Sequence, residues 1–165
     1  MKKILIPLYV IICIFFLAGC SDTLTGEDDL INKAREEIPV ADADTIDLII
    51  AGSNSIENDC LFWFISGNEY QTHTYTPIEF VTVGTDQYKY VHTYKPMDWG
   101  QDISVLMWKD GHSFMINNVD CYSINIKDSS GETHTVSVEE IPFVYYYDKE
   151  LSEYNFIDKD GSILN

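Results

Sequence analysis

The chain is poor in basic residues. Among its 165 residues, ten are lysine or arginine and 27 are aspartate or glutamate, so the formal net charge at pH 7 is −17. A nucleic-acid-binding surface needs basic side chains to replace phosphate counterions, and electrostatic docking on anionic lipid needs a basic patch. The composition therefore argues against a nucleic-acid partner and against attachment to a membrane through charge.

Catalytic signatures are also missing from the sequence. It contains no GxSxG, GxGxxG, P-loop, HExxH or CxxC pattern. The four histidines do not have the spacing of a zinc site on a helix; they are His73, His92, His112 and His134. We predict no catalytic residue, metal site or cofactor, and the sequence favours a role other than catalysis without deciding the point.

The longest apolar run lies near the N-terminus. Lys2 and Lys3 precede the mainly apolar residues 4–17, and the run ends in Leu17-Ala18-Gly19-Cys20. Its length suits the core of a signal peptide and is short for a membrane-spanning helix, which needs about 20 apolar residues. The charged start, apolar core and four-residue ending resemble the signal peptide and lipobox of bacterial lipoproteins.

This resemblance implies a location and a membrane anchor. In lipoproteins of this kind, lipid is attached to the lipobox cysteine, which cleavage then makes the N-terminus. We therefore expect residues 1–19 to be removed and Cys20 to carry acyl chains such as palmitate, on a membrane of the bacterial cell envelope outside the cytoplasm. An ordinary secretory signal with a chance cysteine, or an uncleaved anchor, is the alternative. Cleavage would leave eight basic residues against 27 acidic ones.

The remaining cysteines form a candidate pair. Cys13 would leave with the signal peptide and Cys20 would be acylated, so Cys60 and Cys121 remain. Two remaining cysteines in an exported protein favour a disulfide. Closing a loop of about 60 residues would stabilise the fold by roughly 4 kcal/mol if chain entropy sets the effect. Two buried free thiols are the alternative.

Residues 20–44 are expected to hold the acylated cysteine, a tether and a short helix. The polar, acidic stretch 21–29 is typical of a tether. Thr25 and Asp28 have the spacing of a capping box, and Pro39 ends the run. Apolar side chains every four residues then predict one buried helix face, at positions 30, 34 and 38.

From residue 45 to 165 the apolar pattern changes to a period of two, and no crossover helix is indicated. Asp110-Gly111 is the strongest hairpin signal, and Asp160-Gly161 indicates a last hairpin. The pattern predicts a single all-β domain, mainly an antiparallel sandwich or barrel-like fold, with one short N-terminal helix before it. The strands are expected at residues 45–51, 60–65, 69–75, 78–83, 87–94, 103–109, 112–117, 121–127, 133–139 and 143–147, and the last hairpin at 154–164.

Aromatic residues are plentiful, with eleven Tyr, eight Phe and three Trp. Exposed rings of this kind stack on sugars or anchor protein partners. Trp99, in a loop bounded by proline and glycine, and Tyr145 and Tyr147, in an aromatic strand, are the candidate ligand-binding residues. The alternative is that these rings fill a thin β core.

Residues 45–165 resemble only uncharacterised exported proteins of low-GC bacteria, and that resemblance implies no activity. We expect a membrane-anchored binding or interaction module whose partner is an unknown protein, peptide or carbohydrate. One alternative is an envelope hydrolase assembled from distant strands, with His112 and nearby carboxylates as the first group to test. Another is a protective or immunity-type lipoprotein that binds a cationic peptide, since acidic surfaces steer cations.

Overall fold

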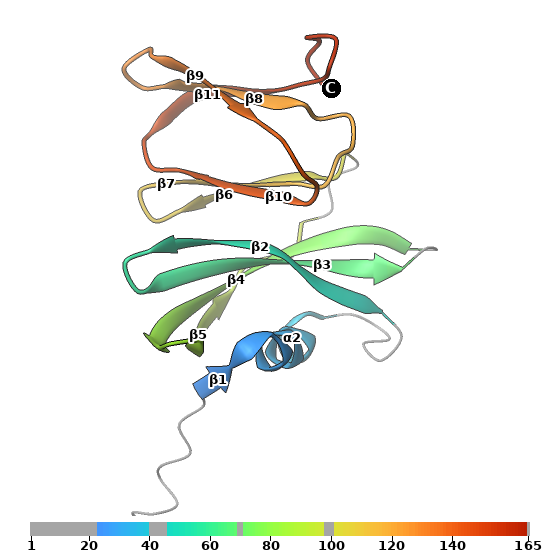
Figure 1. The fold of residues 1–165 in the computed structure, drawn as a ribbon, viewed down its shortest axis with the longest axis vertical. Coiled ribbons are helices and arrows are strands. Elements are labelled where there is room, and N and C mark those ends of the chain that lie inside the picture. The colour runs from blue at the N-terminus through green and yellow to red at the C-terminus, as the bar shows by residue number, and fades with distance from the viewer. Residues whose placement is uncertain (1–22, 40–45, 69–70, 98–100, 165) are drawn as a thin grey trace, which may run out of the picture.

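The computed structural model describes residues 23–39, 46–68, 71–97 and 101–164, which form one helix and eleven strands. All the strand pairs in this part of the chain are antiparallel. The predicted mainly antiparallel β fold with one short helix is confirmed. Figure 1 shows that the strands stack as three sheets, with the helix against the first of them.

The first layer of strands is the five-stranded sheet, with the order β1-β5-β4-β3-β2. Its strands are β1 (Thr23–Thr25), β2 (Asp47–Ile56), β3 (Asp59–Asn68), β4 (Gln71–Gly84) and β5 (Gln87–Thr93). The middle sheet, with the order β10-β7-β6, consists of β6 (Ile103–Trp108), β7 (Gly111–Ile116) and β10 (Phe143–Tyr147). The outer sheet, with the order β11-β8-β9, consists of β8 (Ser123–Asp128), β9 (Thr133–Ser137) and β11 (Leu151–Ile157).

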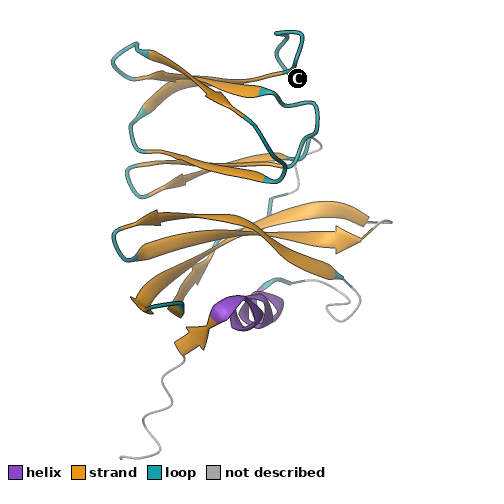
Figure 2. Cartoon of the chain, viewed as in Figure 1, coloured by secondary structure: helices purple, strands orange, loops and turns teal. Residues whose placement is uncertain are grey.

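Helix α2 (Gly26–Glu37) lies on the face of the five-stranded sheet that is turned away from the other sheets, as Figure 2 shows. Thr25 is its N-cap, as the sequence predicted, but the Thr25 side chain makes no capping bond. Instead the Thr25 backbone N–H donates to Asp29 Oδ2 at 2.7 Å. The reciprocal partner is therefore Asp29 and not the predicted Asp28.

The predicted tether is wrong over residues 23–29. Strand β1 pairs with β5, with Thr23 opposite Lys89 and Thr25 opposite Gln87. The helix then begins at Gly26, whose backbone N–H donates to the Asp86 carbonyl at 3.2 Å. The stretch is polar because β1 is a short edge strand and the first helical turn is exposed. Residues 21 and 22 lie outside the described part of the chain.

Three hydrophobic clusters fill the spaces between the four layers. The first lies between the helix and the five-stranded sheet and includes Leu30, Ala34, Phe62, Phe64 and Phe80. The second joins the five-stranded and middle sheets and includes Leu61, Trp63, Tyr75, Trp108 and Met115. The third joins the middle and outer sheets and includes Ile103, Phe114, Ile116, Ile124 and Ile126. Both faces of the middle sheet are therefore buried.

Two predicted strands, 69–75 and 78–83, are a single strand, β4. The prediction ended the first strand at Tyr75 and began the next at Ile78, and Pro77, which has no backbone N–H to donate, lies between them. In the structure Pro77 lies opposite Trp63 of β3, and its carbonyl accepts a hydrogen bond from the Tyr94 N–H at 3.0 Å. The missing N–H therefore does not end the strand.

The predicted hairpin at Asp110-Gly111 exists, but its turn lies one residue earlier. Gly111 pairs with Trp108, so Lys109 and Asp110 are the two loop residues, and Lys109 has a φ of +52°. A Cβ atom at position 111 would overlap the backbone carbonyl of Tyr147 and the Tyr146 hydroxyl. The glycine is needed because β10 passes close to it.

A charged network ties this hairpin to the five-stranded sheet. Lys109 Nζ lies 2.8 Å from Asp59 Oδ2 and 2.8 Å from Glu79 Oε1. The Tyr94 hydroxyl donates to Glu79 Oε2 at 2.8 Å. Burial acts to raise the pKa of Glu79, but its bonds to Lys109 and Tyr94 outweigh burial and lower that pKa. The charged groups of this network pair with one another, and we interpret the network as a link between the middle sheet and the five-stranded sheet.

Candidate functional site

The turn between β8 and β9 is built around one buried carboxylate. Asp128 is 3% exposed. Its Oδ1 accepts hydrogen bonds from Ser130 Oγ at 2.6 Å and from the Glu132 backbone N–H at 2.9 Å. These bonds, the Ser130 hydroxyl foremost, lower the pKa of Asp128, so its carboxylate stays ionised. With Oδ1 occupied, Oδ2 is the oxygen left to face other groups.

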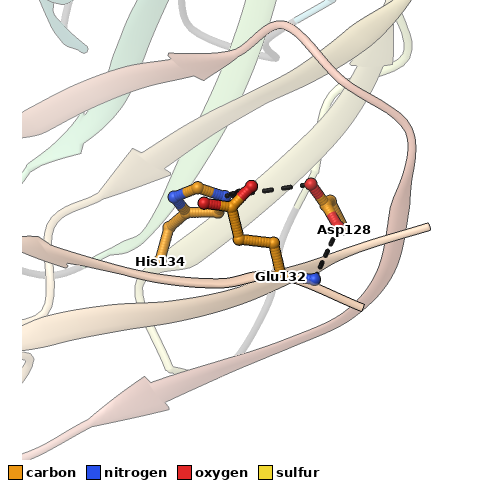
Figure 3. A group of neighbouring side chains, drawn as sticks. All are labelled: Asp128, Glu132 and His134. Atoms are coloured by element: carbon orange, nitrogen blue, oxygen red, sulfur yellow. Dashed lines mark hydrogen bonds and ion pairs between the residues drawn. The ribbon is translucent and has the colours of Figure 1, made fainter. Parts of the chain in front are cut away.

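His134 and Glu132 face that oxygen. The His134 Nε2 atom lies 3.8 Å from Asp128 Oδ2 and 3.7 Å from Glu132 Oε2, and the three groups converge in Figure 3. One ligand atom from each residue can be chosen so that all lie within 4.8 Å of one another. Nε2 is buried and has no hydrogen-bond partner within the described part of the chain. An imidazole nitrogen and two carboxylate oxygens are a donor set that divalent transition metals accept.

Two further side chains border the cluster. Lys149 Nζ lies 3.8 Å from Asp128 Oδ2 and 4.0 Å from Glu132 Oε2. The ring of Tyr147, from β10 in the middle sheet, lies with its centroid 5.6 Å from that of His134. Tyr147 is 6% exposed, and its hydroxyl has no hydrogen-bond partner among the residues that the structure describes. Burial raises its pKa, with smaller effects from Lys149, Asp128 and Glu132.

A second candidate site is an open hollow of about 510 Å³ at one end of the outer sheet. Cys121 and Leu164 contribute apolar lining, and three aspartates and one lysine also line the hollow. Two of the lining side chains are apolar or aromatic and largely exposed, Val119 at 84% and Tyr122 at 62%. The acidic members are Asp120, Asp158 and Asp160, and the basic one is Lys159.

The aromatic residues predicted to bind ligand do not form an exposed platform in the described part of the chain. Tyr147 is buried, and Tyr145 is half-buried between the middle and outer sheets, stacked on Phe143 with ring centroids 6.3 Å apart. The alternative that these rings fill the core therefore describes both tyrosines. Trp99 lies outside the described residues.

The predicted disulfide between Cys60 and Cys121 is wrong. Both thiols are free and buried. Cys60 lies in the cluster beneath the helix, whereas Cys121 lies in the cluster between the middle and outer sheets. The two cysteines belong to cores separated by whole layers, so no local movement could join them. The alternative of two buried free thiols describes the structure.

His112, the first group proposed for a hydrolase, has no carboxylate partner. Burial lowers its pKa, and its Nδ1 atom is buried without a hydrogen-bond partner among the described residues. None of the ion pairs found in those residues includes His112. The histidine that does meet carboxylates is His134, near the start of β9.

The sequence did contain a signal for this cluster. Ser129-Ser130-Gly131 is a stretch typical of a turn, with Asp128 before it and Glu132 and His134 after it, and a hairpin brings such positions together. In a chain with 27 acidic residues, neighbouring carboxylates carry little information. A histidine two residues beyond an acid, directly after a turn, is the more specific feature.

Comparison with models of protein families, with curated proteins and with solved structures finds no match for this chain. In the described residues no helix has the length and apolar character needed to cross a membrane. Any functional conclusion therefore rests on the chain's own residues.

Proposed function

We propose that this protein is an acylated lipoprotein of the bacterial cell envelope, and that its stacked sheets form a binding module held at the membrane surface. The observation that carries the proposal is the ordered N-terminal pattern of Lys2 and Lys3, the apolar residues 4–17 and Leu17-Ala18-Gly19-Cys20. The cysteine thiol is the group in this pattern that can form a thioether to a diacylglyceryl lipid. Two or three acyl chains anchor a protein firmly without a basic patch, which accords with the acidic composition.

The arrangement of the layers supports this proposal. Strand β1 begins at Thr23, three residues after Cys20, and an extended chain covers about 3.5 Å per residue. An acylated Cys20 would therefore hold β1 within roughly 10 Å of the membrane surface. The outer sheet lies at the opposite end of the stack from β1, as Figure 1 shows. Both the hollow and the group of Asp128, Glu132 and His134 would then lie on the part of the molecule farther from the lipid.

Mass spectrometry of the full chain, produced in a bacterium that processes lipoproteins, tests the anchor. We expect the N-terminal peptide to begin at Cys20 and to carry a diacylglyceryl group. Cys20→Ser should abolish acylation, while the matched control Cys13→Ser, in the same apolar segment, should leave it intact. A peptide that begins at Met1, or a Cys20 without fatty chains, would overturn the proposal.

The chemistry of the hollow favours a cationic peptide as the ligand of this module. Asp120, Asp158 and Asp160 line the same hollow as the exposed Tyr122 and Val119. Carboxylates attract lysine and arginine side chains, and an exposed aromatic ring adds a face for cation–π contact. The net charge of −17 would also speed the approach of a cation.

Binding of a lysine-rich peptide, compared with a neutral peptide of equal length, tests this ligand class. We expect the lysine-rich peptide to bind more tightly, with an affinity that falls as salt concentration rises. Asp120→Asn with Asp160→Asn should weaken binding at least threefold, while Asp148→Asn, an exposed aspartate that does not line the hollow, should not. Equal affinity for both peptides, or no effect of salt, would contradict it.

A further inference from the structure

We propose that Asp128, Glu132 and His134 bind one divalent transition-metal ion, of which Zn²⁺ is the representative. This site is independent of the proposed anchor and of the hollow. Its three donors come from a single hairpin, β8 and β9 with the turn between them. Zn²⁺ takes imidazole nitrogen and carboxylate oxygen at about 2.0–2.2 Å, usually in a tetrahedron.

The separations between donor atoms suit such an ion. Two ligand atoms of a tetrahedral zinc site lie about 3.3 Å apart, as the bond lengths require. His134 Nε2 lies 3.8 Å from Asp128 Oδ2 and 3.7 Å from Glu132 Oε2. Each of these two separations needs to shorten by only about half an ångström, and the two carboxylate oxygens lie within 4.8 Å of each other. Glu132 is exposed and its side chain can make that adjustment.

Hydrogen bonds within the turn fix the orientation of one proposed ligand, Asp128. Asp128 is fixed by the Ser130 hydroxyl and the Glu132 N–H on Oδ1, so Oδ2 keeps its direction towards His134. Hydrogen bonds of this kind orient metal ligands in proteins, and removing them weakens metal binding by about 10–100-fold. The carboxylate is almost fully buried, so it presents a charge that a cation can neutralise.

Tyr147 gives an independent indication of a ligand at this position. Buried hydroxyl groups nearly always have a hydrogen-bond partner, yet this one has none among the described residues although Tyr147 is 94% buried, being 6% exposed. Its ring lies against the ring of His134, with centroids 5.6 Å apart. A metal-bound water would supply the partner that the hydroxyl lacks.

A bound metal ion would compete with Lys149 for the carboxylate oxygens. Its ammonium faces the same two oxygens, but at 3.8 and 4.0 Å it is beyond hydrogen-bond distance from both. Its side chain is 53% exposed, so it can swing into solvent. A divalent ion at the oxygens would hold the carboxylates more closely than a distant ammonium does.

Titration of the full chain in detergent with Zn²⁺, in competition with a chromogenic chelator at pH 7.5, tests the site. We expect one Zn²⁺ per chain. His134→Ala should weaken binding by at least about tenfold. The matched control His92→Ala removes an exposed histidine of β5 and should leave the affinity within about twofold. Equal binding by the wild type and His134→Ala, or no binding by the wild type at 100-fold excess of Zn²⁺, would overturn the proposal.

Two more variants keep the test decisive if His134→Ala fails to fold. Glu132→Gln changes an exposed side chain whose backbone N–H, and not its carboxylate, closes the turn. It should fold and still lose at least about threefold in Zn²⁺ affinity, and an unchanged affinity would count against the site. Lys149→Met should tighten binding because a competing positive charge is removed. An affinity equal to or below that of the wild type would show that no metal binds at the oxygens that Lys149 faces.

Discussion

The indole N–H of Trp63 donates a hydrogen bond to Ser113 Oγ at 2.7 Å, and this buried bond joins the five-stranded sheet to the middle sheet. Ser113 in turn donates to Asn54 Oδ1 on β2. The two donors and two acceptors satisfy one another in a space that excludes water. One hydroxyl therefore connects three strands from two layers.

Ser113→Ala should lower the free energy of unfolding by about 1–3 kcal/mol, because it leaves the Trp63 N–H and the Asn54 carbonyl oxygen buried without a partner. Urea denaturation measures the change. The matched control is Ser104→Ala, since Ser104 is equally buried and its hydroxyl lacks a hydrogen-bond partner among the described residues. That change should be neutral or stabilising, and an equal loss in both variants would mean that the Trp63 bond contributes nothing.

Gly111→Ala should destabilise the protein by about 1–3 kcal/mol or more, because a methyl group there overlaps the backbone of β10 at Tyr147. Gly131→Ala is the comparison, as its Cβ would meet nothing within 4 Å and its φ is +90°. It should cost only the backbone strain, about 1 kcal/mol. Thermal unfolding of both variants measures the difference, and a smaller loss at position 111 would contradict the close approach of β10.

Glu79→Gln should lower stability at neutral pH by about 1–3 kcal/mol, because it removes the charge that Lys109 and Tyr94 contact. The folded pKa of Glu79 is lowered from 4.5, so the unfolded chain binds the proton more readily. Its stabilisation is therefore complete well above pH 4.5 and is lost as pH falls through the folded pKa.

Unfolding measured from pH 7 down to pH 3 tests this dependence. The difference between the wild type and Glu79→Gln should narrow as the pH falls below about 4.5. Glu139→Gln, which changes an exposed carboxylate, should leave the free energy of unfolding at pH 7 unchanged. A difference between the wild type and Glu79→Gln that stays constant over the whole range would show that the charge of Glu79 has no part in it.

The thiols of Cys60 and Cys121 should be reduced and slow to react. Both are buried, and burial raises the pKa of Cys121, so little of it is present as the reactive thiolate. Alkylation followed by mass spectrometry should label these two residues after unfolding and scarcely at all before it. A reducing agent should leave the melting temperature unchanged. A melting temperature that falls by several degrees with the reductant would instead indicate that the disulfide predicted from the sequence is present.

Local patterns predicted most of the elements because each element depends on near neighbours. Most period-two segments are strands, and Thr25 is the N-cap of the helix. The errors arose where a distant segment decided the outcome. Pro77 lies inside a strand that pairs with β3 and β5, and the close approach of Tyr147 on β10 leaves no room for a side chain at Gly111.

The candidate metal site also depends partly on local pattern and partly on contacts with distant segments. The sequence placed Asp128, Glu132 and His134 around a turn, and hairpin pairing brings them together. The burial of Asp128 and the arrival of Tyr147 from another sheet required the packing of the middle sheet on the outer sheet. Without those two facts the group would be three polar residues among many.

The sequence by itself determined the strand-rich composition, the acidic charge and the N-terminal pattern that ends at Cys20, because these depend on residue type and short-range order. Only the tertiary structure decided that Cys60 and Cys121 lie in different cores and that His134, and not His112, meets carboxylates. Those outcomes depend on which sheets face each other, and the alternation of residues along a strand does not specify the partner of either face.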